Sequence, residues 1–215
     1  MIVDTASRSQ QLQSRLPGLA FLSLEQPRSA LTSSASARNN LLTEGGIATG
    51  AFVEVLSAAE GAAACSLALT LARPFLARRE AWAVVDPEGT FYPPAAAAMG
   101  FDLKRLILLR PRSDEDAWAF TQVLRASDIS VCFWMTRRMD SMVFRRLQLA
   151  AERGDGLGFV MRPAVAERRP CWARLRLMAS WHAVSGGDDC PHLHARVLHA
   201  AGQFVDSAQE IEVAQ

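Results

Sequence analysis

The chain has 215 residues, of which half are apolar and 21% are charged, and its formal net charge is +1. This balance is typical of one sizeable domain with a full hydrophobic core, and it excludes a mainly disordered chain. The near-zero charge also gives no overall attraction to a polyanion.

Residues 1–40 are rich in serine, glutamine, alanine and arginine and predict a partly disordered arm that is a candidate for docking. The chain begins without a basic region followed by an apolar stretch, and its apolar runs stop well short of about 20 residues, so we expect neither a signal peptide nor a membrane span. The cysteines form no CxxC pair, which favours buried reduced thiols in a cytoplasmic protein.

From Leu41 the sequence alternates between strand and helix patterns. Strands are predicted at 51–56, 81–85, 106–109, 129–134, 158–161, 171–181 and 194–200. Helices are predicted at 61–76, 94–99, from an N-cap at Ser113 to about Ala126, and at 140–153. The core domain is thus expected at 41–205, followed by a tail at 206–215.

Strands separated by helices of this length predict an α/β fold, with a mostly parallel sheet and helices on both of its faces. The last strands follow one another without helices between them, which predicts a few consecutive antiparallel strands near the C-terminus.

Several segments together resemble the RecA-like family. The runs are LLTEGGIATGAFVEVL, AWAVVDPEGTFYPPAAAAMGFDLKRLILLRP, DEDAWAFTQVLRASDISVCFW and FRRLQLAAERGDGLGFVMRP. The last of these resembles the ImuA group, RecA-like proteins that accompany an error-prone polymerase module in bacterial SOS mutagenesis. The resemblance covers roughly Leu41 to Met178 and depends on order and spacing rather than on one motif.

A phosphate-binding loop needs glycine-freed backbone N–H groups, a lysine, and a Ser or Thr that holds magnesium. Here the segment after the first core strand keeps Gly61, has Ala63 or Ala64 at the lysine position, and adds a negative charge at Glu60. Lys104, the only lysine, lies two units downstream. We therefore expect a degenerate nucleotide loop and no ATP or magnesium cofactor. Its residues are Ser57, Glu60, Gly61, Ala63, Ala64, Cys65 and Ser66.

The strand of the Walker B type ends at Trp134 and Met135 without a carboxylate. Asp86-Pro87-Glu88 stands where the family has Asp-x-Glu, so Glu88 and Asp86 are vestigial catalytic candidates, although a cap and turn at a strand exit is the favoured reading. The resemblance places a nucleotide-reporting glutamine where this chain has Arg162. ATP hydrolysis is not expected.

Arginine pairs could follow a phosphate backbone or form a solvated, partly salt-bridged face. These DNA-binding candidates are Arg137, Arg138, Arg145, Arg146, Arg168, Arg169, Arg174 and Arg176. A second segment, from Asp188 through Cys190, His192 and His194, could suggest a metal, but the spacing favours a histidine-bearing surface loop and we expect no metal.

The first hypothesis is a non-catalytic RecA-like interaction protein in DNA repair and SOS-induced translesion synthesis. The resemblance implies an ImuB-like protein and an error-prone polymerase as partners, with RecA, single-stranded DNA and self-association as further candidates, and no membrane. The arm 1–40 and the helix 140–153 are the candidate contacts. A DNA-dependent ATPase or recombinase and a SulA-like inhibitor of cell division are the alternatives.

Overall fold

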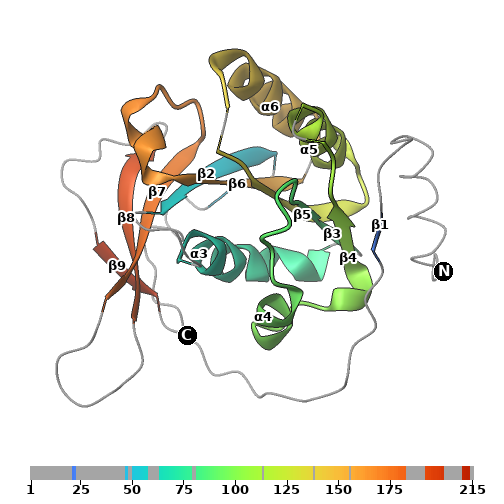
Figure 1. The fold of residues 1–215 in the computed structure, drawn as a ribbon, viewed down its shortest axis with the longest axis horizontal. Helices are drawn as coiled ribbons and strands as arrows, with labels where there is room; N and C mark the ends of the chain where they lie inside the picture. The colour runs from blue at the N-terminus through green and yellow to red at the C-terminus, as the bar shows by residue number, and fades with distance from the viewer. Residues whose placement is uncertain are drawn as a thin grey trace.

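The described part of the chain folds around one mixed β-sheet (Figure 1). The computed structural model describes residues 21–22, 47, 50–57, 63–78, 81–112, 114–137, 139–154, 156–182, 192–200 and 210–213. The strand order is β1-β4-β3-β5-β6-β2-β7-β8-β9. The strands are β1 (Phe21–Leu22), β2 (Ala51–Ser57), β3 (Ala81–Val85), β4 (Leu106–Leu109), β5 (Ile129–Met135), β6 (Leu157–Pro163), β7 (Leu175–His182), β8 (His192–Ala200) and β9 (Glu210–Val213).

The strands from β4 across to β7 are parallel, and β2 lies between β6 and β7. β3 and β4 are buried along their whole length, which explains why their sequences AWAVV and LILL are continuous apolar runs rather than alternating ones. β8 and β9 continue the sheet in antiparallel fashion. The predicted α/β class, mostly parallel sheet and antiparallel C-terminal strands are confirmed.

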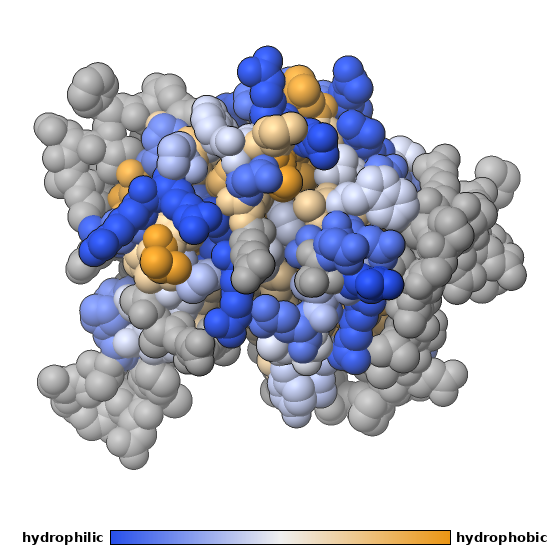
Figure 2. All heavy atoms as spheres, turned by 45° about the horizontal axis from the view of Figure 1, so that its top comes forward, coloured by the Kyte–Doolittle hydropathy of each residue, from blue (hydrophilic) through white to orange (hydrophobic). Residues whose placement is uncertain are grey.

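Helices cover both faces of the sheet, as predicted. α3 (Ala63–Ala72) and α4 (Pro93–Ala98) pack on one face with Val53, Trp82 and Phe133. α5 (Asp116–Arg125) and α6 (Ser141–Arg153) pack on the other face with Phe52 and Trp134. The outer surface on the side of α5 and α6 is mainly hydrophilic, with apolar side chains between the polar ones (Figure 2).

Most element boundaries differ from the predicted ones by a few residues, and the larger differences are at α3, α5 and β7. α3 ends at Ala72 and continues as the 3-10 helix η1 (Arg73–Arg78), because Pro74 lacks the N–H of an α-helical hydrogen bond. α5 begins at Asp116 with Glu115 as its N-cap, so the predicted N-cap at Ser113 is wrong. β7 begins at Leu175 rather than Cys171, and just before it the Arg174 N–H donates to the carbonyl of Phe52 on β2.

Both chain ends contribute strands to the sheet. Phe21 and Leu22 of the predicted arm pair with Leu109 and Leu108 of β4. Residues 210–213, predicted as part of a tail, form β9 and pair with β8. The core therefore extends beyond the predicted 41–205 limits, because exposed strand edges bind further strands regardless of sequence distance. In the part of the chain that is described, no helix has the length and apolar character to cross a membrane.

Gly154 ends α6 at a point of close backbone contact. A Cβ placed on Gly154 would lie 2.6 Å from the Leu124 carbonyl oxygen at the end of α5, while its φ of −102° would suit any residue. We predict that Gly154→Ala lowers the free energy of unfolding by about 1–3 kcal/mol through steric overlap alone. Urea denaturation measures this, with the exposed neighbour Arg153→Ala as the control within about 0.5 kcal/mol. Equal stability of the two variants would contradict the contact.

Candidate functional site

The carboxyl edge of the parallel strands is the place where the topology puts a ligand. In an open α/β sheet, ligands bind outside the carboxyl ends of neighbouring strands whose following helices lie on opposite faces. β3 and β5 are such neighbours, because α4 follows β3 on one face and α6 follows β5 on the other. The loops after β2, β3 and β5 carry the residues predicted for nucleotide chemistry.

The predicted nucleotide loop is described only in part. Ser57 ends β2 and is half-buried, while Ala63, Ala64, Cys65 and Ser66 form the start of α3, with the two alanines buried. Glu60 and Gly61 lie outside the described residues. Burial, aided by the negative charge of Asp86, raises the pKa of the Cys65 thiol to about 12, so this thiol stays protonated and unreactive.

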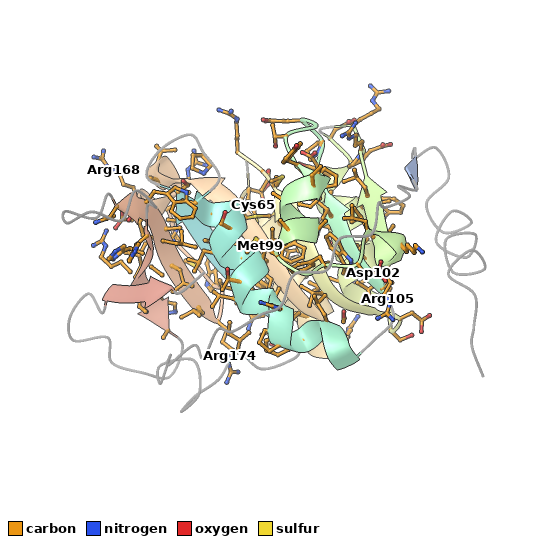
Figure 3. All side chains as sticks on the ribbon, turned by 90° about the horizontal axis from the view of Figure 1, so that it is seen from below. Cys65, Met99, Asp102, Arg105, Arg168 and Arg174 are labelled. Carbon is orange, nitrogen blue, oxygen red and sulfur yellow. The ribbon has the colours of Figure 1, made fainter. Side chains whose placement is uncertain are left out.

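Lys104 sits at the opposite edge of the sheet from this loop. It belongs to the 3-10 helix η2 (Leu103–Arg105), which leads into the amino end of β4. In the same segment, Asp102 and Arg105 form an exposed ion pair of 3.5 Å (Figure 3). The single lysine of the chain therefore does not reach the nucleotide loop.

Asp86 is fully buried at the carboxyl end of β3, and its carboxylate binds the loop that follows this strand. One carboxylate oxygen accepts a hydrogen bond from the Thr90 N–H at 2.9 Å, and the other accepts from the Phe91 N–H at 2.9 Å. The Thr90 hydroxyl donates a further bond to this group at 3.3 Å. This is the cap and turn at a strand exit that the sequence favoured.

Glu88 forms an ion pair with Arg137 across the loops that follow β3 and β5. The carboxylate oxygen lies 3.2 Å from the Arg137 Nε, and the two side chains are 49% and 61% exposed. The pair lies at the position where the topology puts a ligand. At this exposure it contributes only about 0–1 kcal/mol to stability.

Asp116 at the start of α5 brings a carboxylate near the end of β5 that the sequence reading missed. Burial raises the pKa of Asp116, and its hydrogen bond from the Ala117 N–H and the dipoles of Trp134 and Thr136 oppose that rise. The Trp134 indole N–H is not within hydrogen-bond geometry of an acceptor among the described residues. This carboxylate thus comes from α5, the helix that follows β4, and not from β5 itself.

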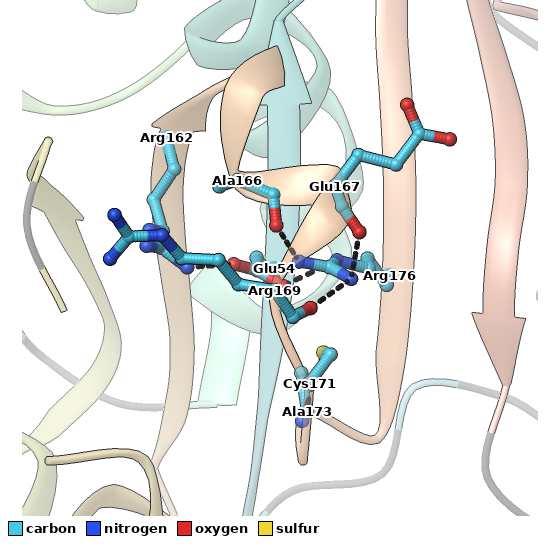
Figure 4. A network of polar contacts seen from close by, with 8 residues as sticks. All are labelled: Glu54, Arg162, Ala166, Glu167, Arg169, Cys171, Ala173 and Arg176. Atoms are coloured by element: carbon cyan, nitrogen blue, oxygen red, sulfur yellow. Dashed lines mark hydrogen bonds and ion pairs between the residues drawn. The ribbon is translucent and has the colours of Figure 1, made fainter. Parts of the chain in front are cut away.

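A buried charge cluster occupies the middle of the sheet (Figure 4). Glu54 of β2 is fully buried, and one of its oxygens accepts a hydrogen bond of 2.7 Å from Arg162 of β6. Its other oxygen forms an ion pair of 2.7 Å with the Nε of Arg176 on β7. Arg162 also lies 5.8 Å above the Phe144 ring of α6, a cation–π contact that partly offsets its burial.

Arg176 also holds the segment that connects β6 to β7. Its guanidinium donates to the carbonyls of Ala166, Glu167 and Arg169 at 2.6, 3.2 and 3.0 Å (Figure 4). These carbonyls belong to or follow the 3-10 helix η3 (Ala164–Arg168). Arg176, one of the DNA-binding candidates, is therefore not a surface arginine: its side chain is only 7% exposed and contacts Glu54 and these carbonyls.

Only one feature of the sequence points to the Glu54 cluster. Glu54 is a charge in the middle of AFVEVL, a strand that is otherwise apolar and buried. Arg162, for which the resemblance implied the position of a nucleotide-reporting glutamine, binds Glu54. Burial and the nearby Glu54 carboxylate also raise the pKa of the Cys171 thiol to about 12.

The remaining arginine candidates are scattered rather than gathered into one track. Arg145 and Arg146 are exposed on α6, Arg168 and Arg169 are exposed at η3, and Arg137 is paired with Glu88. Arg168 and Arg174 lie far apart on the molecule (Figure 3). Arg138 lies outside the described residues.

The histidines of the predicted surface loop lie on one strand, β8, rather than in a loop. His192 and His194 begin β8, and His194 stacks on His182 of β7 with ring centroids 4.3 Å apart. Cys190, Asp188 and Asp189 lie outside the described residues. Within the described ranges, no three histidine, cysteine or acidic side chains gather into a group that could hold a metal ion.

We predict that Glu54→Gln costs about 3–5 kcal/mol of unfolding free energy, because two buried guanidinium groups lose their counter-charge. The matched control is Glu88→Gln, which removes an exposed ion pair and should change stability by about 1 kcal/mol or less. Urea denaturation of the full chain measures both. A small effect at Glu54 would mean that the cluster does not hold the sheet together.

We predict that Asp116→Asn stabilises the protein at neutral pH. Because the folded-state pKa is raised above 3.8, the folded chain binds this proton more tightly than the unfolded chain, and stability falls as pH rises through that range. The gain from Asp116→Asn should therefore be largest near neutral pH and shrink as pH falls toward about 4. Thermal melting across this range tests it, with the exposed Asp114→Asn as the control; a gain that is independent of pH would refute it.

Comparison with known proteins adds no further assignment: no family model and no curated protein matches this sequence.

Proposed function

We propose that this protein is a non-catalytic RecA-like interaction protein that acts in DNA repair, docking to a mutagenic polymerase complex during SOS-induced translesion synthesis. The sequence resemblance to the ImuA group supports the choice of process. The partners in this proposal are an ImuB-like protein and an error-prone polymerase, with RecA as a further candidate.

The observation that carries the non-catalytic part is the state of Asp86. A carboxylate that orients magnesium or activates water needs a free oxygen facing the ligand. Both oxygens of Asp86 instead accept hydrogen bonds from backbone N–H groups of the following turn, and the side chain is fully buried. The alanines at the start of α3 supply no cation for a triphosphate.

The arrangement of the arginines supports docking to protein rather than to DNA as the main role. A nucleic-acid track needs several cations in a row along one surface. In the described residues Arg176 is buried, Arg137 is paired, and Arg168 lies far from Arg174 (Figure 3). Contact with single-stranded DNA is therefore a weak, secondary part of the proposal.

Glu88→Gln separates a scaffold from an ATPase. We predict that a host strain lacking this gene loses damage-induced mutagenesis and that the Glu88→Gln variant restores it fully, because a scaffold needs no catalytic base. Mutation frequency after ultraviolet irradiation is the measurement, and the destabilised Glu54→Gln variant is the comparison expected to fail.

In parallel, labelled ATP with magnesium should show no saturable binding to the purified wild-type chain, with RecA as the positive control. Micromolar ATP binding, or loss of complementation by Glu88→Gln at normal protein level, would contradict the non-catalytic proposal. Unchanged mutagenesis in the deletion strain would contradict the proposed process.

A further inference from the structure

α6 has two faces of different character. Its inner face buries Phe144, Leu147, Ala150 and Ala151 against the sheet and α5. Its solvent side carries two large apolar side chains, Met142 and Leu149, which are 65% and 43% exposed. Single exposed apolar residues are ordinary on protein surfaces, so their spacing matters more than their presence.

The exposed residues of α6 follow the spacing of a helix–helix contact. Positions 142, 146, 149 and 153 are separated by four, three and four residues, which places them along one line on the helix surface. Met142 and Leu149 alternate on this line with Arg146 and Arg153, and Arg145 lies beside it. We call these five residues the α6 outer face.

The α6 outer face carries uncompensated positive charge. Its three arginines are exposed, and none forms an ion pair within the part of the chain that the structure describes. Glu152, the acid of the same helix, accepts a hydrogen bond from Gln148 at 3.2 Å. Apolar (orange) and strongly hydrophilic (blue) side chains are intermixed on this side of the molecule (Figure 2).

We infer that the α6 outer face is a docking surface for an acidic amphipathic helix of a partner protein. Such a helix would set apolar side chains against Met142 and Leu149 and carboxylates against the arginines. A second copy of this chain does not fit, because its arginines would meet like charges. A nucleic acid does not fit either, because two apolar side chains on the central line would face phosphates.

Trp172 is a further exposed aromatic side chain that contacts α6. It is 47% exposed and packs edge-on against Phe144 of the inner face, in the first turn of α6, with ring centroids 5.8 Å apart. The inference deepens the proposed docking role, but its evidence is the geometry of α6 alone.

The docking inference can be tested with a displayed library of helical peptides and the full-length protein. The peptides are about three heptads long, and one face is randomised over acidic, basic and apolar residues. The selected peptides should combine apolar and acidic positions. Their affinity should fall at least about tenfold for Met142→Ser/Leu149→Ser and for Arg145→Glu/Arg146→Glu. It should stay unchanged for Arg112→Glu, an exposed arginine elsewhere, and thermal melting confirms that each variant is folded.

A charge exchange makes the test specific. Replacing the glutamates of the best peptide by lysines should abolish its binding to wild type and restore binding to Arg145→Glu/Arg146→Glu. Selection of basic peptides, or binding that is insensitive to both pairs of substitutions, would overturn the inference. So would tight binding of a labelled 20-nucleotide oligo-dT that needs the arginines but not Met142 and Leu149. In each case the polymerase complex can still bind elsewhere, so the docking role is judged separately by the mutagenesis assay.

Discussion

The structure depends on one buried negative charge. Glu54 lies on β2, between β6 and β7, and it contacts an arginine from each of these neighbouring strands. In a medium of low polarity these charges are stable only together, because either partner alone would remain unsolvated. The cluster therefore favours a single register of three strands, where apolar contacts alone would tolerate more than one.

Arg176 also couples this cluster to the segment that connects β6 to β7. Three backbone carbonyls of the β6–β7 connection accept its hydrogen bonds, so the path of that segment is coupled to the charge on β2. Segments that connect strands are usually free to vary. Here Arg176 holds the backbone of the β6–β7 connection, while Val165, Arg168 and Arg169 are exposed.

The side chains at the carboxyl edge of the sheet and those on the α6 outer face differ in how many contacts they make. At the carboxyl edge, Asp86 accepts hydrogen bonds from the turn that follows β3, and Glu88 pairs with Arg137. Both side chains therefore hold the loops of this edge in place. On α6, the inner face is complete while the outer face still carries apolar groups and arginines without described partners.

The sequence by itself determined the α/β class and the types of most elements, because helix and strand periods are local properties. It also shows that Lys104 is the only lysine and lies outside the predicted nucleotide loop. The strand order decided the rest. Glu54 and Arg162 are 108 residues apart, and Glu88 and Arg137 are 49 apart, so no local pattern could pair them. Arg176 looked like a surface arginine for the same reason: only the neighbouring strand shows that its side chain points to a buried carboxylate.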